Sequence, residues 1–298
     1  MRDRRTYLGG SDIAGVLNTC PYSSPLQVWH RKVNGEEKTD SDGMYFGRRL
    51  EGFVKREFKK RNKEFKIIKG DVIKHDIYEY LSGSPDGYLL ASNGDRFILE
   101  IKTCNEYNKE KWEKGVPENY YAQVQWYMGL SGLKSAYVAC FAGGNKYYQY
   151  EIPFSIAFFE DAVAKAVKFW ERYVLVGEQP RATDKDCDRR LLGLSITQSE
   201  KEDILRTSYL DEPVSEYQQL KEQEKALKKQ LRLNYNRILE EMGTHPKAES
   251  HSFKLDYKTH NRTTVDSKKL AKEYPEVFSK VMKQAGFDKL SIKSKVKK

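Results

Sequence analysis

Asp86, Glu100 and Lys102 lie in a short stretch of the 298-residue chain, in the pattern Pro-Asp, thirteen residues, Glu, one residue, Lys. Carboxylate oxygens are the ligands that hard divalent cations such as Mg²⁺ prefer. Side chains two residues apart on a strand point to the same face, so Glu100 and Lys102 are expected to project together. The pattern therefore predicts a cation site with a lysine beside it.

The segment that carries these residues is predicted to be a β-hairpin. Apolar runs at 89–90 and 97–99 flank Ser92-Asn93-Gly94, which is typical of a turn. A strict two-residue turn at Asn93-Gly94 would place Asp86 and Glu100 on opposite faces of the sheet. Their convergence on one cation therefore requires an odd number of loop residues, a β-bulge, or an Asp86 that lies in a turn outside the strand.

Composition indicates a soluble globular protein. Hydrophobic residues make up 39% of the chain and charged residues 32%, and no apolar run approaches the roughly 20 residues needed to cross a bilayer. No apolar segment follows the charged N-terminus, so no secretory signal is expected. The four cysteines are widely spaced, which argues against a structural zinc site or an iron–sulfur cluster and favours reduced thiols in a cytosol.

The net charge of +10 is concentrated toward the C-terminus. Residues 211–298 hold 20 Lys and Arg against 13 Asp and Glu, whereas residues 1–210 hold 33 against 30. A basic balance favours a polyanionic partner through attraction to phosphates and release of counterions. A lysine-rich solubilising tail would give the same balance, so charge alone does not decide between a nucleic-acid partner and a solvated tail.

Gly9-Gly10-Ser11-Asp12 is predicted to open a helix, with Ser11 or Asp12 as the N-cap. The glycines would allow a phosphate to approach the free N–H groups of that helix, and Arg4 and Arg5 just upstream are able to pair with it. An ordinary capped helix with a basic leader explains the same residues. On this segment alone, the ordinary helix is the favoured interpretation.

Two later helices are expected to bring polar residues to the hairpin. The helix at about 44–62 has an apolar stripe with Glu51 beside it, and the helix at about 117–131 carries Gln123 among aromatic residues. A polar, irregular stretch at 181–211 is interpreted as a boundary. Beyond it, apolar residues at intervals of three, four and seven predict a helix of about 30 residues with a coiled-coil-like face.

These segments together resemble the YqaJ-type viral recombinase family, relatives of phage lambda exonuclease within the PD-(D/E)XK nuclease superfamily. The resemblance is carried, in chain order, by residues 9–14, 46–51, 82–87, 99–102 and 122–127. It implies a restriction-endonuclease-like α/β fold, with a mixed β-sheet flanked by helices. Residues 1–200 would form this exonuclease domain, and residues 201–298 a basic, mostly helical extension.

The resemblance also implies a metal centre. By position, Asp86 and Glu100 correspond to the family's metal carboxylates, and Ile101 would supply a backbone carbonyl. Glu51 corresponds to the helical acid that supports a second metal ion or its water. Two Mg²⁺ or Mn²⁺ ions per active site are therefore expected.

The remaining site residues are assigned in the same way. Lys102 corresponds to the lysine that orients and activates the attacking water, either with a lowered pKa or as a charged group that stabilises negative charge. Gln123 corresponds to the helical glutamine of the active site. The residues that the resemblance places near a DNA phosphate or 5′ phosphate are Ser11, Ser84 and either Arg4 or Arg5.

The activity implied is hydrolysis of one strand of duplex DNA in the 5′→3′ direction, which leaves 3′ single strands for recombination. The resemblance further implies a phage or prophage protein in the bacterial cytoplasm, a ring-shaped trimer and a single-strand annealing protein as partner. We expect the C-terminal extension to add affinity for DNA or to dock that partner.

Two alternatives stay open. The chain could be a PD-(D/E)XK endonuclease or structure-specific nuclease, or a non-catalytic DNA-binding protein with a nuclease fold. The complete acidic set together with Lys102 argues against the non-catalytic alternative.

Overall fold

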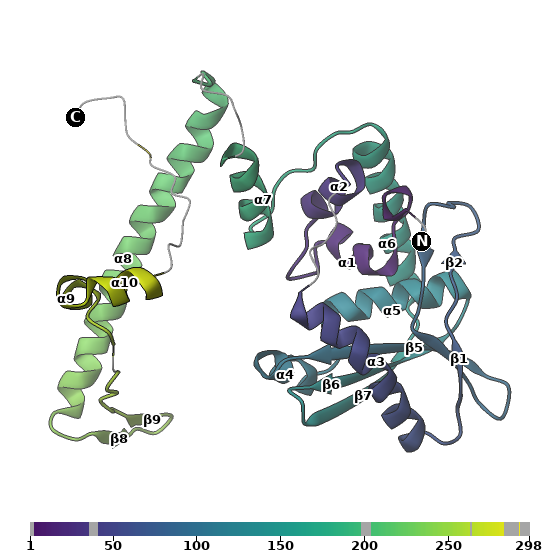
Figure 1. The fold of residues 1–298 in the computed structure, drawn as a ribbon, viewed down its shortest axis with the longest axis horizontal. Helices are drawn as coiled ribbons and strands as arrows, with labels where there is room; N and C mark the ends of the chain where they lie inside the picture. The colour runs from purple at the N-terminus through teal and green to yellow at the C-terminus, as the bar shows by residue number, and fades with distance from the viewer. Residues whose placement is uncertain (1–2, 36–40, 198–203, 263, 283–291, 293–298) are drawn as a thin grey trace. The chain divides into compact units, whose positions relative to one another are not determined.

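The computed structural model describes residues 3–35, 41–197, 204–262, 264–282 and 292. The chain divides into two compact units, residues 1–199 and 200–298. The first unit contains a central β-sheet with helices around it, and the second contains one long helix with smaller elements (Figure 1).

The sheet of the first unit is mixed. Its spatial order is β1-β4-β5-β6-β7, and the pairing of β5 with β6 is parallel whereas every other pairing in this sheet is antiparallel. A parallel pair needs a crossover connection. Between β5 and β6 this connection contains the helix at Glu118–Ser131. The strands are β1 (Lys66–Lys69), β4 (Gly87–Leu90), β5 (Arg96–Cys104), β6 (Ser135–Ala142) and β7 (Lys146–Pro153).

The helices of the first unit cover both faces of this sheet. They are α1 (Gly10–Val16), α2 (Pro25–Val33), α3 (Asp42–Arg61), α4 (Lys109–Glu113), α5 (Glu118–Ser131), α6 (Ile156–Phe169) and α7 (Asp186–Thr197). Phe58 of α3 is buried in one cluster with Leu89 and Leu99. Met128 of α5 is buried in another with Ile98. Because neighbouring strand residues face opposite ways, α3 covers one face and α5 the other.

Two sequence-based predictions about helices are wrong. Gly9 is the N-cap of α1, and neither Ser11 nor Asp12 has that place. The Asp12 carboxylate instead accepts a hydrogen bond from the backbone N–H of Gly9, at 3.1 Å. The stretch predicted to be irregular also contains α7 (Asp186–Thr197), whose start is held by the buried Asp188, which accepts a hydrogen bond from the hydroxyl of Thr183 at 2.7 Å.

The hairpin between β4 and β5 has a loop with an odd number of residues, which is one of the features that allow Asp86 and Glu100 to face the same side of the sheet. Gly87 pairs with Leu99 and Leu90 pairs with Arg96, so residues 91–95 form a five-residue connection. The odd number brings Asp86, just before β4, opposite Glu100 on the same face of the sheet. Of the three features that permit convergence, the odd loop is present, and a plain two-residue turn at Asn93-Gly94 does not form.

Two short strands and a short helix connect the N-terminus to this sheet. The strands β2 (Ile73–Lys74) and β3 (Ser82–Gly83) pair with each other, and the 3₁₀-helix η1 spans Arg4–Thr6. Leu8 pairs with Leu81 in a parallel bridge, because the backbone N–H of Ser82 donates to the Leu8 carbonyl at 2.9 Å. The chain entering α1 is thereby fixed beside the chain that leads to Asp86.

The second unit is built around α8 (Asp211–Met242), which confirms the long helix predicted beyond the irregular stretch. It also contains η4 (Ser208–Leu210), a hairpin of β8 (Lys247–Glu249) and β9 (Lys254–Asp256), α9 (Ser267–Glu273) and α10 (Pro275–Val281). Among the residues that the structure describes, no helix is long and apolar enough to span a bilayer.

Gly70 provides a test of how β1 holds the turn before Asp86. A Cβ at this position would lie 1.9 Å from the carbonyl oxygen of Pro85, which is backbone and has little freedom to move. We predict that Gly70→Ala destabilises the protein by about 1–3 kcal/mol, since overpacking at a rigid contact costs that much. Gly52→Ala is the matched control, because its Cβ would meet only the Arg56 side chain, at 3.6 Å. Chemical denaturation of both variants measures the difference, and equal stability would contradict the prediction.

Candidate active site

Asp86 and Glu100 lie opposite each other at the end of the β4–β5 pairing, directly before β4 begins. The pairing of β4 with β5 begins at Gly87, so β5 continues past it without that neighbour. The backbone N–H of Ile101 instead donates to Oδ2 of Asp86, at 2.7 Å. The Asp86 side chain thus takes the place of the missing strand, and this bond fixes one carboxylate beside the strand that carries the other.

Glu100 and Lys102 project together from β5, as their spacing predicts. The Glu100 residue is 2% exposed, and its Oε1 accepts a hydrogen bond from Nζ of Lys102 at 2.5 Å. The second oxygen, Oε2, is buried and has no hydrogen-bond partner among the described residues. A buried carboxylate oxygen without a partner is costly unless another group, such as a cation, binds it.

Both carboxylates have a raised pKa. Burial raises the pKa of Glu100, and the charge of Asp86 adds to this against the opposing effect of Lys102, so that the pKa is about 7. Burial also raises the pKa of Asp86 above its ordinary value, although Lys102 and the Ile101 N–H act against the shift. Burial would lower the pKa of Lys102, but the charges of Glu100 and Asp86 outweigh it and raise that pKa. The site therefore holds more negative charge than one lysine offsets.

A divalent cation suits this donor set. Asp86 and Glu100 offer hard oxygen ligands on one face of the sheet, and the unpartnered Oε2 of Glu100 is available for coordination. Within the described part of the chain, however, no three side chains of Asp, Glu, His or Cys are already gathered as a metal-binding group. The two carboxylates are a pair to which a third ligand must be added.

Glu51 is the acid that is not gathered with this pair. It lies on α3, across the sheet edge, and its carboxylate accepts a hydrogen bond from Nζ of Lys55 at 2.5 Å. The same ammonium donates to the backbone carbonyl of Asp86, at 2.8 Å. The charge of Glu51 still contributes to the raised pKa of Asp86, so the three acids share one electrostatic environment.

Lys55 is a residue of this site that the sequence motifs do not indicate. Its spacing of four residues from Glu51 does predict an ion pair on one helix face. The bond to Asp86 joins segments 31 residues apart, and no local pattern shows it.

Gln123 lies on α5 at the same face of the sheet as Glu100, and it is 9% exposed. Its Nε2 donates to the hydroxyl of Tyr127, at 2.8 Å. Burial raises the pKa of Tyr127 far above its ordinary value, with further contributions from the charges of Glu100 and Asp86. Gln123 is thus connected to the carboxylates through Tyr127, a second residue that the sequence reasoning missed.

Tyr127 also brings the two predicted phosphate-binding serines toward the site. Its ring packs so closely on Gly10 and Gly83 that a Cβ at either glycine would lie within 2.7 Å of it. Ser11 directly follows Gly10, and Ser84 directly follows Gly83. The backbone that precedes each serine therefore packs on one aromatic ring, while the serines themselves are exposed.

Arg4 and Arg5 have different surroundings. Nη2 of Arg4 donates to the hydroxyl of Ser11, at 3.1 Å. The guanidinium of Arg5 instead binds the exposed carboxylate of Asp3, at 2.9 Å. Of the two arginines, Arg4 is the one that lies with a predicted phosphate-binding residue.

A buried ion pair holds Arg4 in this position. Nζ of Lys32 on α2 donates to the Asp12 carboxylate at 2.7 Å and to the backbone carbonyl of Arg4 at 2.8 Å. The Lys32 side chain is 3% exposed and that of Asp12 is 6% exposed. Burial would raise the pKa of Asp12, but Lys32 and the neighbouring Arg31 outweigh it and hold the pKa below its ordinary value. η1, α1 and α2 are thus fastened together behind the guanidinium.

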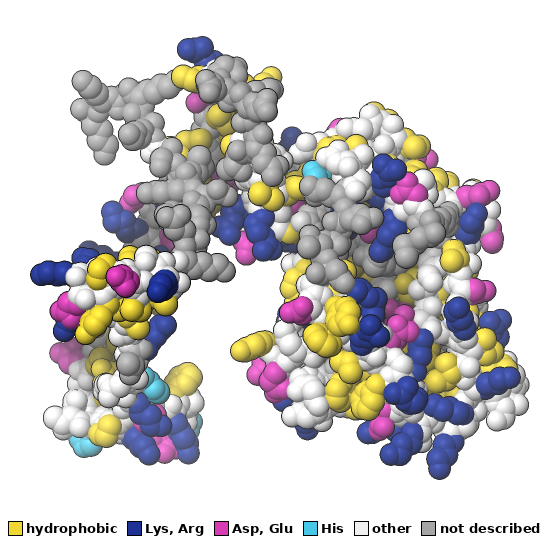
Figure 2. Space-filling model, viewed as in Figure 1, with side chains coloured by type: hydrophobic (Ala, Val, Ile, Leu, Met, Phe, Trp, Pro, Cys, Tyr) yellow, Lys and Arg dark blue, Asp and Glu magenta, His cyan; other side chains and the backbone are white. Residues whose placement is uncertain are grey.

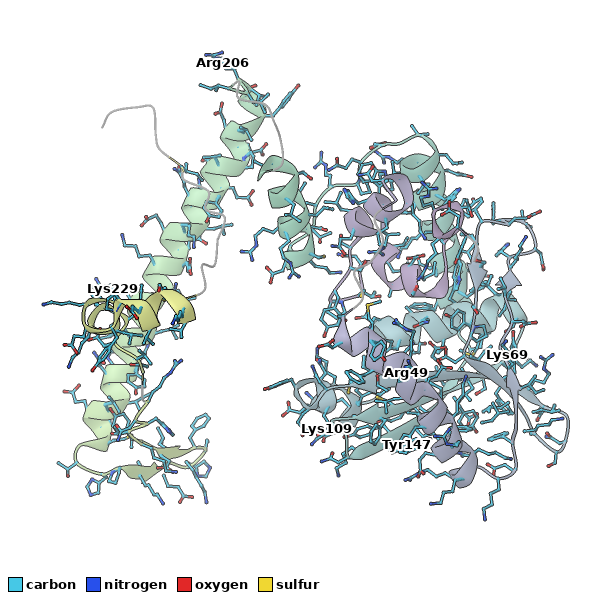
Figure 3. The ribbon with its side chains drawn as sticks, viewed as in Figure 1. Arg49, Lys69, Lys109, Tyr147, Arg206 and Lys229 are labelled. Atoms are coloured by element: carbon cyan, nitrogen blue, oxygen red, sulfur yellow. The ribbon has the colours of Figure 1, made fainter. Side chains whose placement is uncertain are left out.

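A cavity of about 590 Å³ is lined by residues that neighbour the site residues in sequence, although neither carboxylate of the pair lines it. Leu50, which precedes Glu51, and Thr103, which follows Lys102, both line it. Tyr120 lines it as well, and Nζ of Lys102 lies 5.0 Å from the centre of that ring. On α3, Arg49 lies 5.3 Å from the ring of the partly exposed Tyr45 (Figure 3). The approach to the site therefore combines aromatic surfaces with positive charge.

Comparison with known proteins agrees with the sequence motifs. Residues 1–134 match the YqaJ-like viral recombinase domain. The resemblance to the YqaJ-type family is confirmed. The chain is also similar to the uncharacterized protein YqaJ of Bacillus subtilis (strain 168), with 29% identity over 297 residues, which cover 98% of this chain and 92% of that protein.

Solved structures share the fold. LHK-Exo in complex with dAMP superposes with a TM-score of 0.50 at 17% identity, over 66% of this chain and 96% of that one. A second structure of LHK-Exo, an alkaline exonuclease from Laribacter hongkongensis, gives 0.49 at the same identity and coverage. The predicted α/β nuclease fold, a mixed sheet flanked by helices, is confirmed.

The ion pair behind Arg4 provides a test of the N-terminal arrangement. We predict that Lys32→Met destabilises the protein by about 3–5 kcal/mol, because the buried Asp12 carboxylate loses the nearer of its two cations and keeps only Arg31, at 3.5 Å. Lys165→Met is the matched control: its ammonium binds Asp161 at the same 2.7 Å, but both side chains are more than half exposed, so the loss is about 0.2–1 kcal/mol. Urea denaturation distinguishes them.

The same pair predicts a dependence of stability on pH. Because the pKa of Asp12 is lowered in the folded state, its contribution is present above the unfolded-state pKa and is lost as pH falls through the folded-state pKa. Asp12→Asn should therefore show a smaller loss of stability on acidification than the wild type. An unchanged acid dependence would contradict this assignment.

Proposed function

We propose that this protein is a metal-dependent DNA exonuclease that degrades one strand of a duplex from its 5′ end and leaves 3′ single strands. The observation that carries the proposal is the convergence of Asp86 and Glu100 on one face beside Lys102, with a buried Glu100 oxygen that has no partner among the described residues. The confirmed resemblance to YqaJ-like domains supports it. LHK-Exo, whose fold this chain shares, is an alkaline exonuclease.

In this proposal, Asp86 and Glu100 hold a divalent cation, Mg²⁺ or Mn²⁺, together with the backbone carbonyl of Ile101. When bound, the cation would neutralise charge on the scissile phosphate and make a water molecule more acidic. Glu51 would support a second cation, which requires its carboxylate to exchange Lys55 for that ion. Lys55 keeps Glu51 next to Asp86 in the meantime, because it binds both residues.

Lys102 and Gln123 act on the reacting groups. The Lys102 ammonium, 2.5 Å from Glu100, lies where it would orient the attacking water and offset negative charge that develops on the phosphate. Gln123 is locked by its hydrogen bond to Tyr127, so its amide is held without rotational freedom at the edge of the site. Figure 2 shows Lys and Arg side chains spread over the visible face of the first unit, which suits a polyanionic substrate.

The terminal phosphate would be bound by Arg4, Ser11 and Ser84. A guanidinium is able to pair with a phosphate through two hydrogen bonds, and the hydrogen bond from Arg4 to Ser11 keeps these two groups within reach of one phosphate, which supports the assignment. A site for a 5′ phosphate close to the carboxylates would set both the polarity of degradation and the preference for ends.

Digestion of DNA substrates tests the proposal. Linear duplex labelled at either end should lose 5′ nucleotides when Mg²⁺ is present and remain intact in EDTA, whereas covalently closed plasmid should remain intact in both. Cleavage of the closed circle would favour the endonuclease alternative. Binding without cleavage of any substrate would favour a non-catalytic DNA-binding protein.

Substitutions in the centre test the residue assignments. We predict that Asp86→Ala or Lys102→Ala lowers the rate of degradation by at least about 100-fold, as loss of a group that stabilises developing charge does elsewhere. Duplex binding should change little, since neither residue contributes most of the basic surface. Asp95→Ala, in the exposed turn of the same hairpin, is the control and should retain full activity. Full activity of either centre variant would overturn the assignment.

The two arginines give a paired test of the 5′-phosphate site. We predict that Arg4→Ala lowers the preference for a 5′ phosphate over a 5′ hydroxyl by about 10- to 100-fold, which is the range for a charged hydrogen bond. Arg5→Ala should keep the preference, because its guanidinium binds Asp3. The ratio of rates on the two substrates measures this. A loss of preference in Arg5→Ala alone would place the phosphate elsewhere.

A further inference from the structure

An apolar stripe along α8 is exposed. Side chains that would be buried in a packed helix are about half exposed: Tyr217 (49%), Leu220 (55%), Leu227 (56%), Leu231 (61%) and Ile238 (45%). They recur at intervals of three, four and seven residues, so they lie on one side of the helix. The stripe is therefore a continuous surface along most of a 32-residue helix.

The second unit does not cover this surface. Met242 is its one buried residue within the described ranges 204–262, 264–282 and 292. A helix of this kind gains most of its stability from packing of its apolar side and has little when that side is wet. The stripe fits a helix that requires another helix beside it.

The order of side chains along the stripe identifies that helix. In heptad terms the two core positions alternate as Tyr217, Leu220, Glu224, Leu227, Leu231, Asn234, Ile238 and Glu241. The six inner positions of this order are self-complementary about residue 229. When the sequence is laid antiparallel on itself, Leu227 opposes Leu231 of the other copy, Leu220 opposes Ile238, and Glu224 opposes Asn234. In these three pairs apolar meets apolar and polar meets polar, whereas the outermost pair, Tyr217 with Glu241, is mixed.

Charge favours an antiparallel over a parallel pair of α8 helices. Glu224 accepts hydrogen bonds from Lys221 at 2.8 Å and Lys228 at 2.6 Å in its own helix. In a parallel pair Glu224 would face the Glu224 of the other copy, which is repulsive at a core position. In the antiparallel pair it faces Asn234 and Arg237 of the other copy, which offer an amide and a guanidinium as donors.

We propose that α8 is a self-association helix that pairs antiparallel with α8 of a second copy of this chain, with the two-fold axis at residue 229. Leu227 and Leu231 form the centre of the interface, and Leu220 and Ile238 form its two ends. This arrangement does not depend on the nuclease proposal, because it uses no residue of the first unit.

Cysteine pairing in the full chain tests the direction. We predict that chains carrying Leu220→Cys and chains carrying Ile238→Cys, co-expressed and oxidised at low concentration, form a disulfide-linked heterodimer. Neither variant alone should link, because two copies of residue 220 would lie about 27 Å apart along the antiparallel pair. The wild-type chain under the same oxidation controls for its four own cysteines. Linkage within Leu220→Cys chains alone, or no linkage in the mixture, would overturn the proposal.

The molar mass in solution tests the surface itself. Light scattering on the full chain should show that Leu227→Glu halves the mass at a concentration at which the wild type is fully paired. Lys229→Glu is the matched control, since residue 229 is two positions from both Leu227 and Leu231 and therefore lies on the opposite side of the same helix (its place on α8 is labelled in Figure 3), and it should leave the mass unchanged. A wild-type mass that Leu227→Glu does not alter would show that another surface covers the stripe, and would refute self-pairing.

Discussion

Two carboxylates with like charge are forced together in a buried place, and the rest of the first unit is arranged to make that tolerable. Asp86 and Glu100 face each other across the last step of a strand pair. Both have a raised pKa, which records the cost of holding negative charge there. The Ile101 N–H and Lys102 compensate part of that cost directly. The remainder is the electrostatic reason why a divalent cation suits this pair of carboxylates.

The helices α3 and α5 pack on opposite faces of the sheet, and each brings side chains to the pair Asp86 and Glu100. α5 lies on the face of the carboxylates and brings Gln123 and Tyr127 close to them. α3 lies on the other face. Lys55 of this helix hydrogen-bonds both to Glu51 and to the backbone carbonyl of Asp86, and so connects α3 to the start of β4. Tyr127 in turn packs on Gly10 and Gly83, so the N-terminal segment reaches the same centre. Residues more than a hundred positions apart in the chain thus surround the end of the β4–β5 pairing.

Features of the fold and the site that depend on neighbouring residues could be predicted from the sequence, whereas those that depend on contacts between distant residues could not. The spacing of Glu100 and Lys102 on one strand fixed their common direction, and the parity of the hairpin showed that its loop could not be a plain two-residue turn. The helix with Gln123 and the long α8 followed from periodicity. The N-cap at Gly9 and the helix α7 were missed, because capping by Asp12 and fastening through Asp188 depend on side-chain contacts that propensity does not show. Lys55 and Lys32 were missed for the same reason: each donates to a backbone carbonyl about thirty residues away.

The five-residue turn between β4 and β5 also restricts how this protein can vary. Surface turns usually accept insertions and deletions of any length, because they add little strain. Here the loss or gain of a single residue in 91–95 would reverse the facing of every later side chain relative to β4 and move Glu100 away from Asp86. Changes of two residues would keep the two acids together. In relatives that retain this pair, the turn should therefore vary in length by even steps, although it lies on the surface.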